Sequence, residues 1–349
     1  MDEKILKRRI EKKATLLQAM KQMDKERVKL LFIFDKENFI GIFTIGDIQR
    51  AILSKVSLNS HIYNHIDINK EYSFPNESLV DVKKKMIEMR TECMPIIDSK
   101  GQLIGAYFWE DIFGENQVPC FGKIDIPVVI MAGGKGTRLK PLTNIIPKPL
   151  LPIGDKTILE IILDKFTQAG CSKFYMSVNY KSGFLKYYLE NIPINYDIIF
   201  FEENEPLGTI GSVSLLKDKI TTPFFVSNCD ILIEQDFREV YNYHVTNKND
   251  ITIVTAIKTH QIPYGVIEAG EYGLMTKLTE KPEFNYMINT GVYILQPDVI
   301  NEIPHGKFYH ITDLIDKIRK NGGHVGCFPI SEKSWIDIGE WNEYLKLIR

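Results

Sequence analysis

Residues 126–154 read IPVVIMAGGKGTRLKPLTNIIPKPLLPIG. The stretch begins with an unbroken apolar run, 126–132, which leads directly into a glycine-rich loop. Such a run is typical of a buried parallel strand. Glycines directly after a strand let backbone N–H groups approach a phosphate, and Arg138 and Lys148 add fixed positive charge. The spacing is neither the GxxxxGK[ST] of a P-loop nor the GxGxxG of a dinucleotide-binding loop. The stretch therefore predicts a phosphate-binding loop of another kind at the end of a buried strand.

Apolar runs alternate with helix-length segments in the rest of the chain. KFYMSVN follows segment 157–169, YDIIFFEE follows 184–191, and PFFVSNCD follows 211–219. This alternation predicts βαβ units and a Rossmann-like α/β domain with a mostly parallel, doubly wound sheet. Ligands of such sheets bind outside the carboxyl ends of the strands, which is where most of the polar motifs fall.

The glycine loop and the motifs after it resemble a known family. GGKGTRLKPLTNIIPKPLLPIG (133–154) is similar to the signature of the nucleotidyltransferases that make NDP-sugars, and the resemblance continues to the C-terminus. Later motifs follow in that family's order, namely EPLGT (205–209), SNCD (227–230), EKP (280–282), NTGVY (289–293) and WIDIG (335–339). The resemblance implies that a sugar 1-phosphate attacks the α-phosphorus of a nucleoside triphosphate and that pyrophosphate leaves. Because both reactants are anions, catalysis of this kind rests on charge neutralisation and alignment.

The resemblance also implies roles for individual residues. Asp230 and Asp337 would hold Mg²⁺, and the catalytic cations would be Arg138, Lys148 and Lys281. The sugar-binding residues would be Gly265, Glu280, Asn289 and Thr290. The nucleotide-binding residues would be Ala132, Gly133, Gly134, Gly136, Thr137, Glu203, Gly208 and Thr209. Taken singly, the two aspartates also suit turns, and Glu280 with Lys281 also suits a solvated pair; their joint presence in order favours the site.

By the same resemblance, Glu203, five residues before Gly208, occupies the position of a side chain that reads the base. A carboxylate accepts two hydrogen bonds, and guanine offers two adjacent donors, whereas uracil and thymine offer one donor between acceptors. Glu203 therefore favours GTP over UTP and the other triphosphates. The neighbouring Glu202 and Glu205 leave open a shift of register.

An internal repeat precedes the catalytic motifs. Residues 16–53 and 79–114 each run helix, strand, acidic turn, strand and a short helix opened by an aspartate, with Gly41 matching Gly105. The repeat resembles a tandem pair of CBS domains, a small α+β module that senses adenosine nucleotides. By that resemblance Thr44, Asp47 and Asp111 are ligand-binding positions, although Phe108 replaces threonine in the second half. As alternatives, the aspartates are helix N-caps and the module only dimerises.

Bulk properties set the remaining expectations. The 349 residues suit two domains, and we predict a CBS pair over 1–118, a linker over 115–124 and the catalytic domain over 125–349. A formal net charge of -2 and five scattered cysteines give no sign of nucleic-acid binding, a zinc site or a disulfide framework. The N-terminus carries acidic residues and no apolar core stretch, and the chain has no long apolar run, which favours a cytoplasmic location without membrane contact. CBS pairs commonly associate, so a homodimer is expected.

The combination of domains sharpens the functional expectation. A CBS pair ahead of such a catalytic domain resembles the glucosamine-1-phosphate guanylyltransferases of legionaminic (nonulosonic) acid biosynthesis. GTP and glucosamine 1-phosphate are therefore the expected substrates. The alternatives are a mannose-, heptose- or glucose-1-phosphate guanylyl- or uridylyltransferase and, in another class, a non-catalytic nucleotide-sensing protein. That last alternative predicts loss of an active-site charge, and none of the expected charges is missing.

Overall fold

The computed structural model describes residues 3–67, 70–89, 91–113, 123–193 and 197–348. Two compact units divide the chain, one spanning Met1–Lys123 and the other Ile124–Arg349. The predicted linker lies outside the described residues except at Lys123 and Ile124. Ile124 belongs to the second unit, because it is buried and its N–H donates to the carbonyl of Ala169 at 3.0 Å.

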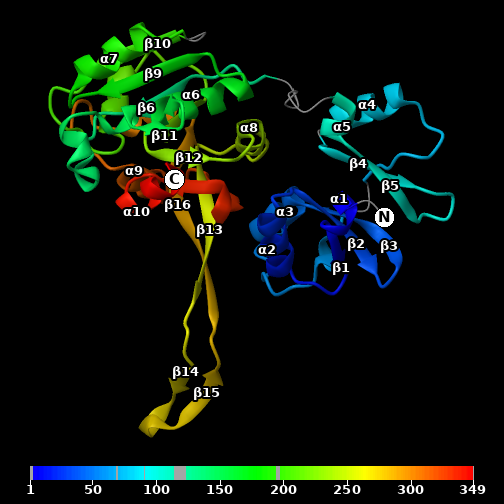
Figure 1. Ribbon diagram of the computed structural model, residues 1–349. Helices are drawn as coiled ribbons and strands as arrows, with labels where there is room; N and C mark the ends of the chain where they lie inside the picture. The colour runs from blue at the N-terminus through cyan, green and yellow to red at the C-terminus, as the bar shows by residue number, and fades with distance from the viewer. Residues whose placement is uncertain (1–2, 68–69, 90, 114–122, 194–196, 349) are drawn as a thin grey trace. The chain divides into compact units, whose positions relative to one another are not determined.

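A seven-stranded sheet forms the centre of the second unit, which we call the transferase unit (Figure 1). Its order is β10-β9-β6-β11-β16-β13-β17, and only β16 runs antiparallel to its two neighbours. This arrangement confirms the predicted mostly parallel α/β sheet. The strands are β6 (Val128–Met131), β9 (Lys173–Val178), β10 (Asp197–Glu202), β11 (Phe224–Asn228), β13 (Ile251–Gln261), β16 (Glu283–Leu295) and β17 (Val325–Ser331).

Helices and apolar clusters cover both faces of this sheet. On one face α6 (Ile158–Ala169) packs against α8 (Phe237–Thr246), with the rings of Phe166 and Phe237 stacked at 4.1 Å. On the other face α9 (Ile311–Lys320) covers a second cluster. Helix α6 begins at a capping box between Thr157 and Glu160 and ends at Gly170, whose φ is +109°. The remaining helices are α7 (Ser182–Glu190) and α10 (Trp341–Leu347).

Segment 211–219, predicted to be of helix length, contains only the 3₁₀ helix η5 (Gly211–Leu216). A Cβ on Gly211 would lie 2.4 Å from the carbonyl oxygen of Lys307, so the backbone approaches another segment closely. The Ser214 hydroxyl also donates to the Gly211 carbonyl at 2.7 Å. These contacts hold the segment in a tight turn, which the apolar pattern alone did not reveal.

A long ribbon extends from the transferase unit (Figure 1). Strands β13 and β16 pair without a shift of register from Thr255–Asn289 out to Gln261–Glu283. The ribbon continues through β14 (Val266–Ala269) and β15 (Met275–Thr279), which pair with each other. We call residues 258–287 the arm and the rest of this unit the body. Beside the arm's origin, β12 (Ile231–Ile233) pairs with β18 (Trp335–Asp337), and β7 (Pro152–Ile153) pairs with β8 (Lys156–Thr157) elsewhere in the body.

The first unit shows the repeat in three dimensions. Strands β1 (Arg9–Glu11), β2 (Leu30–Asp35) and β3 (Asn38–Thr44) form one sheet, and β4 (Cys93–Ile97) and β5 (Leu103–Phe108) form the other. Ser73 bridges β4 in parallel, much as β1 pairs with β2. Both halves contribute to one apolar cluster, which includes Phe32 and Phe108. The helices are α1 (Glu3–Leu6), α2 (Leu16–Glu26), α3 (Ile45–Leu53), α4 (Leu79–Glu88) and α5 (Trp109–Phe113).

Across the described ranges of both units, no helix combines the length and the apolar character that crossing a membrane requires.

Candidate active site

The glycine loop and the SNCD motif begin at the same edge of the central sheet. Strands β6 and β11 are parallel neighbours in which Asn228 pairs with Met131. Ala132 continues from β6 into the glycine loop, and Asp230 follows two residues after β11. The two motifs are separated by about one hundred residues in the sequence, yet the parallel pairing of their strands places them side by side.

Lys148 and Asp230 form an ion pair inside this edge. The Lys148 ammonium donates to Oδ2 of Asp230, and the two side chains are 8% and 18% exposed. The other carboxylate oxygen, Oδ1, is buried and has no hydrogen-bond partner within the described part of the chain. A buried carboxylate oxygen without a partner carries a substantial desolvation cost, so a positive ligand at that atom would be strongly favoured.

Gly136 makes room for Lys148. Its φ is +60°, and a Cβ there would lie 3.0 Å from Thr143 and 3.1 Å from the Cβ of Lys148. The third glycine of the loop is therefore required both by backbone conformation and by the close approach of the lysine.

Asp337 and Arg138 join the same cluster from other segments. Asp337 pairs with Ile231 across the β12–β18 ladder, and the N–H of Ile338 donates to the Asp230 carbonyl at 2.9 Å. Oδ1 of Asp337 accepts from the N–H of Gly339 at 2.6 Å. A Cβ on Gly339 would lie 2.9 Å from a guanidinium nitrogen of Arg138, so that cation lies directly over the WIDIG turn.

The two aspartates fit Mg²⁺. In the described ranges no three or more His, Cys, Asp and Glu residues form a metal-binding group. Mg²⁺ commonly takes only one or two carboxylates together with substrate phosphates and water, so two aspartates suffice. The partnerless Oδ1 of Asp230 is the kind of hard oxygen donor that this ion prefers.

Cys229, between Asn228 and Asp230, is not a nucleophile. It is buried, and burial first, then the neighbouring Asp230 charge, raises the pKa of its thiol to about 12. A thiol of that pKa stays protonated at neutral pH and is therefore a poor nucleophile.

Glu203 lies against the glycine loop, as its predicted role requires. A Cβ on Gly133 would be 3.2 Å from Oε1 of Glu203. The glutamate is buried, however, and both of its oxygens are already engaged. The hydroxyl of Ser177 donates to Oε1, and the N–H of Leu207 donates to Oε2 at 3.0 Å. Glu203 thus stabilises the 203–207 loop through its bond from the Leu207 N–H. Each of its carboxylate oxygens can still accept one more hydrogen bond.

Gly208 and Thr209 are held by a segment far along the chain. Gly208 has a φ of +81°, and a Cβ there would be 2.6 Å from the carbonyl oxygen of Tyr309. The Thr209 hydroxyl accepts from the N–H of Ile311 at 2.9 Å, which caps the first turn of α9. The EPLGT motif therefore packs against the segment that begins α9. Its role at the nucleotide stays a prediction.

Two of the four predicted sugar-binding residues, Asn289 and Thr290, lie in the body; the other two lie on the arm together with Lys281, a predicted catalytic cation. Thr290 is buried and donates to the Val254 carbonyl at 2.8 Å, and Asn289 accepts from the N–H of Gly291 at 3.0 Å. Gly265, Glu280 and Lys281 are exposed on the arm, at the level where β14 begins and β15 ends. In Figure 1, β14 and β15 lie at the far end of the ribbon from β12, and Asp230 directly precedes β12. The structure therefore does not bring these three residues near Asp230 within one chain.

Sequence comparison agrees with this geometry. Residues 127–349, more than half of the chain, match the family described as "Nucleotidyl transferase". The chain belongs to the nucleotidyl transferase family. Residues 9–54 match the CBS domain family.

Mannose-1-phosphate guanyltransferases are among the relatives of this nucleotidyl transferase. The Schizosaccharomyces pombe protein is 33% identical and the Saccharomyces cerevisiae protein 36% identical, each over 226 residues. The matched region is 62% of this chain and 62% of each relative, so the chain spans less than two thirds of their length. Among solved structures, HddC from Yersinia pseudotuberculosis is 29% identical, with a TM-score of 0.49, over 64% of this chain and 98% of HddC.

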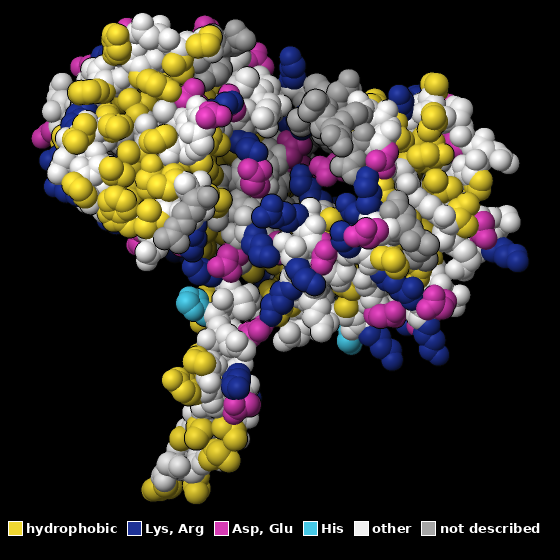
Figure 2. All heavy atoms as spheres, in the orientation of Figure 1, with side chains coloured by type: hydrophobic (Ala, Val, Ile, Leu, Met, Phe, Trp, Pro, Cys, Tyr) yellow, Lys and Arg dark blue, Asp and Glu magenta, His cyan; other side chains and the backbone are white. Residues whose placement is uncertain are grey.

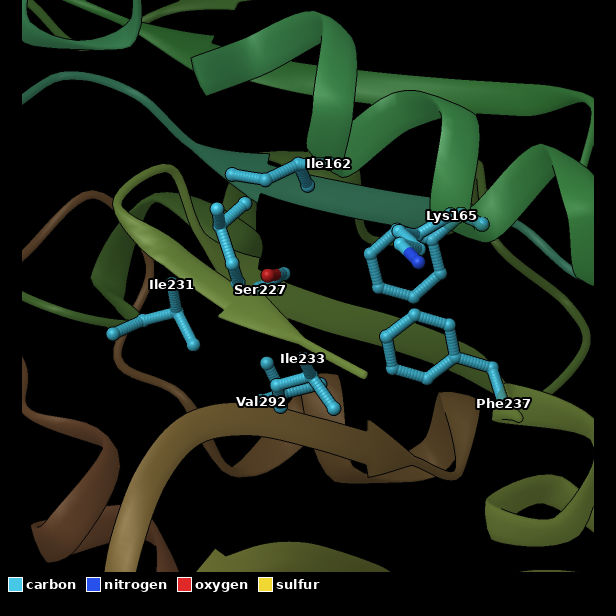
Figure 3. A pocket seen from close by; sticks show the side chains of 9 residues that line it. Ile162, Lys165, Ser227, Ile231, Ile233, Phe237 and Val292 are labelled. Atoms are coloured by element: carbon cyan, nitrogen blue, oxygen red, sulfur yellow. The ribbon is translucent and has the colours of Figure 1, made fainter. Parts of the chain in front are cut away.

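A small, mostly apolar cavity lies beside β12 in the transferase unit (Figure 3). Side chains from α6, α8 and β12 line it together with Ser227 and Val292. The Ser227 hydroxyl donates to the neighbouring Asn228 carbonyl at 3.0 Å, and Lys165 pairs with Glu234. Because Lys165 is paired with Glu234 and the rest of the lining is apolar apart from Ser227, we assign this cavity no role in phosphate binding.

In the CBS domain the predicted ligand residues are already engaged with the protein. Thr44 caps α3, and Asp47 completes a capping box with it, so the helix opens at the threonine and not at the aspartate as predicted. The side chain of Asp47 is fully buried and also accepts from Arg50 and Lys70. Lys70 lies outside both repeat segments. Nothing in the sequence sets Lys70 apart from Lys55, which also lies between the repeat segments, so no local signal identified it.

The second half of the repeat differs. Phe108, at the position of Thr44, is buried in the shared apolar cluster. Asp111 is exposed and pairs with Lys4 at 2.9 Å. The buried carboxylate of the first half therefore has no counterpart in the second.

Proposed function

We propose that this chain transfers a nucleotidyl group from a nucleoside triphosphate to a sugar 1-phosphate, with release of pyrophosphate. The observation that carries the proposal is the cluster of Arg138, Lys148, Asp230 and Asp337 at the carboxyl ends of β6 and β11. Chemistry between two phosphates needs fixed cations and a metal-binding carboxylate in one place. A non-catalytic sensor would have no need to keep Oδ1 of Asp230 without a partner.

The residues divide the work between positioning and charge. Asp230 fixes Lys148 in a largely buried position, so the ammonium is preorganised before substrate arrives. Glycines of the loop expose backbone N–H groups to the triphosphate, and Arg138 stabilises the departing pyrophosphate. When bound to Asp230 and Asp337, Mg²⁺ would neutralise phosphate charge and hold the phosphates in line. A phosphate oxygen of the sugar 1-phosphate then displaces pyrophosphate directly, with no covalent enzyme intermediate.

GTP is the proposed donor. Glu203 lies beside Gly133 and keeps lone pairs for the two adjacent donors of guanine. The names of the curated relatives also specify guanylyl transfer.

Mannose 1-phosphate is the first acceptor to test, because the relatives are named for it. Glucosamine 1-phosphate, expected from the pairing of a CBS module with this catalytic domain, is the second. Support for the legionaminic acid pathway rests on that pairing alone.

The test is pyrophosphate release with Mg²⁺ across four nucleoside triphosphates and a panel of sugar 1-phosphates. Release with GTP and one hexose 1-phosphate is expected. Release only with UTP would retain the reaction and overturn the role of Glu203. An absence of release from every pair, with adenine nucleotides also present, would favour the sensor.

For the first unit we propose an adenine nucleotide as ligand, since residues 9–54 match a CBS domain and Asp47 is its buried carboxylate. The ribose hydroxyls would have to replace Lys70 at Asp47. An adenine nucleotide is expected to raise the melting temperature, and dimerisation alone would be the better account of a curve that does not move.

A further inference from the structure

The arm is a two-stranded ribbon with a large apolar surface. Strand β13 pairs with β17 only as far as Ile257, and beyond that point it pairs with β16 alone. An isolated two-stranded ribbon is marginally stable at best in water. Figure 2 shows apolar side chains on the visible face of the arm. The large apolar residues exposed on the arm are Ile262, Tyr264, Ile267, Tyr272, Leu274, Met275, Leu278, Phe284, Tyr286 and Met287. So much apolar surface on a thin ribbon indicates a second protein surface that covers it.

The arm cannot fold back onto the body of the same chain while the pairing between β13 and β16 is intact. The ladder runs without a shift of register from Thr255–Asn289 to Gln261–Glu283. It is extended by a bond from the N–H of Ile262 to the Pro282 carbonyl at 3.0 Å. At about 3.3 Å per residue, the level of Tyr264 lies about 20 Å beyond Ile257. Folding back would break the hydrogen bonds that form the ribbon.

A polar, conformationally unusual site lies in the middle of this apolar ribbon. Lys281 has a φ of +44°, which is uncommon for a residue other than glycine. Its N–H donates to the Tyr264 carbonyl at 3.3 Å. A Cβ on Gly265 would lie 3.0 Å from a carboxylate oxygen of Glu280, so the glycine lets that carboxylate lie against the backbone. Strained positions that carry charged groups are concentrated at functional sites.

The cation predicted to hold the sugar phosphate lies on the arm. In the body, Lys148 is paired with Asp230, and Arg138 lies 3.9 Å from Glu340. The proposed reaction brings a second anion, the sugar phosphate, against a triphosphate. Lys281 is exposed on the arm, about 20 Å from Ile257, the last residue of β13 that pairs with a strand on each side.

We propose that the arm of one copy enters the active site of a second copy of this chain, where Lys281 and Glu280 contact the acceptor sugar phosphate. This inference rests on the proposed function. In a two-fold dimer each arm serves the other body, and both sites are completed at once. The body has exposed apolar side chains that could contact the arm. Ile145, within the 133–154 motif, and Phe184 and Tyr187, on α7, are 73%, 59% and 71% exposed. Lys181 ties that motif to α7 through the Ile145 carbonyl at 2.9 Å.

The experiment is complementation between full-length variants. Asp230→Asn disables the body and Lys281→Ala disables the arm, and each alone is expected to lose at least a hundredfold in activity. The two chains, carrying different tags, are co-expressed and the hetero-oligomer is purified through both tags. Each heterodimer then contains one site built from an intact body and an intact arm. The expected activity is about half that of the wild-type dimer per dimer.

Two control pairs exclude general rescue. Asp230→Asn with Asp337→Asn places both changes in the body, and Glu280→Gln with Lys281→Ala places both on the arm. Neither pair can form an intact site by exchange of arms, so neither is expected to recover. If the wild type is active but the Asp230→Asn and Lys281→Ala chains are inactive together, or do not associate, the exchange of arms is overturned. The proposed function would then still stand. A wild type inactive with every substrate pair would remove both.

Discussion

Asp230 in the transferase unit and Asp47 in the CBS domain each accept a bond from a lysine that is at most 10% exposed, but their remaining lone pairs differ. Around Asp47 the protein supplies every donor, from the N–H and hydroxyl of Thr44, from Arg50 and from Lys70. Around the Asp230 carboxylate, the described part of the chain supplies Lys148 at Oδ2 and no hydrogen-bond partner for the buried Oδ1. A fully satisfied carboxylate stabilises its own fold, whereas a half-satisfied one is prepared for a ligand.

The largest effect is expected at the half-satisfied carboxylate. Asp230→Asn removes the charge that fixes Lys148 and holds the metal, so kcat should fall by at least a hundredfold while the fold persists. Steady-state pyrophosphate release and circular dichroism measure the two properties. Asp164→Asn, which removes an exposed partner of Lys156, is the matched control and should retain activity. Near-normal turnover in Asp230→Asn would remove the distinction between the two aspartates.

At the satisfied carboxylate the main effect is on stability. Asp47→Ala leaves Lys70 largely buried without its counter-charge, and burial already lowers the pKa of that lysine. The free energy of local unfolding in the first unit should fall by about 3 kcal/mol. Hydrogen exchange in β2 and β3 measures this separately from the transferase unit.

Lys70→Met is the companion variant. It keeps an apolar stem but frees one donor position on Asp47, so an adenine nucleotide should raise the melting temperature more than in the wild type. An unchanged response in Lys70→Met would argue that Asp47 serves only as part of the capping box.

The two aspartates also show what sequence could reveal. The alternation of apolar runs predicted the parallel sheet, and the order of the motifs predicted which residues lie at its edge, because parallel strands place their carboxyl ends together. Lys70 and Ser177 belong to no motif, and their contacts depend on the packing of distant segments. The arm was likewise hidden, since β13 and β16 read as ordinary strands and nothing local shows that they outlast β17.

Glu203 tests an intermediate case, a buried carboxylate that is engaged at both oxygens yet lies against the glycine loop. Glu203→Gln keeps the size but replaces one acceptor with a donor that opposes the N–H groups of guanine. The preference for GTP over UTP in kcat/KM should fall about tenfold, as expected for the loss of one hydrogen bond to the base. Ser177→Ala, which removes only the internal donor, should lower stability and leave the preference in place. A preference that survives Glu203→Gln would place Glu203 with Asp47, as a residue that stabilises its own loop.

His244 gives the smallest expected effect. It is a buried ionisable group for which the described residues provide no ion pair. Its ring is buried, with Nδ1 2.9 Å from the Thr252 hydroxyl and Nε2 accepting from the Gln296 amide at 3.1 Å. Burial lowers its pKa from 6.5 to about 4, so the folded protein keeps the ring neutral where the unfolded chain already binds a proton. Because the unfolded state binds more protons in that window, the free energy of unfolding should fall as pH drops from about 6.5 to about 4. In His244→Gln the same drop should be shallower, and denaturant titrations of both proteins at pH 7, 5.5 and 4.5 compare the slopes. Equal slopes in the two proteins would mean that the His244 ring is protonated in the folded state. Burial would then not lower the pKa of His244, contrary to the general rule for a buried histidine.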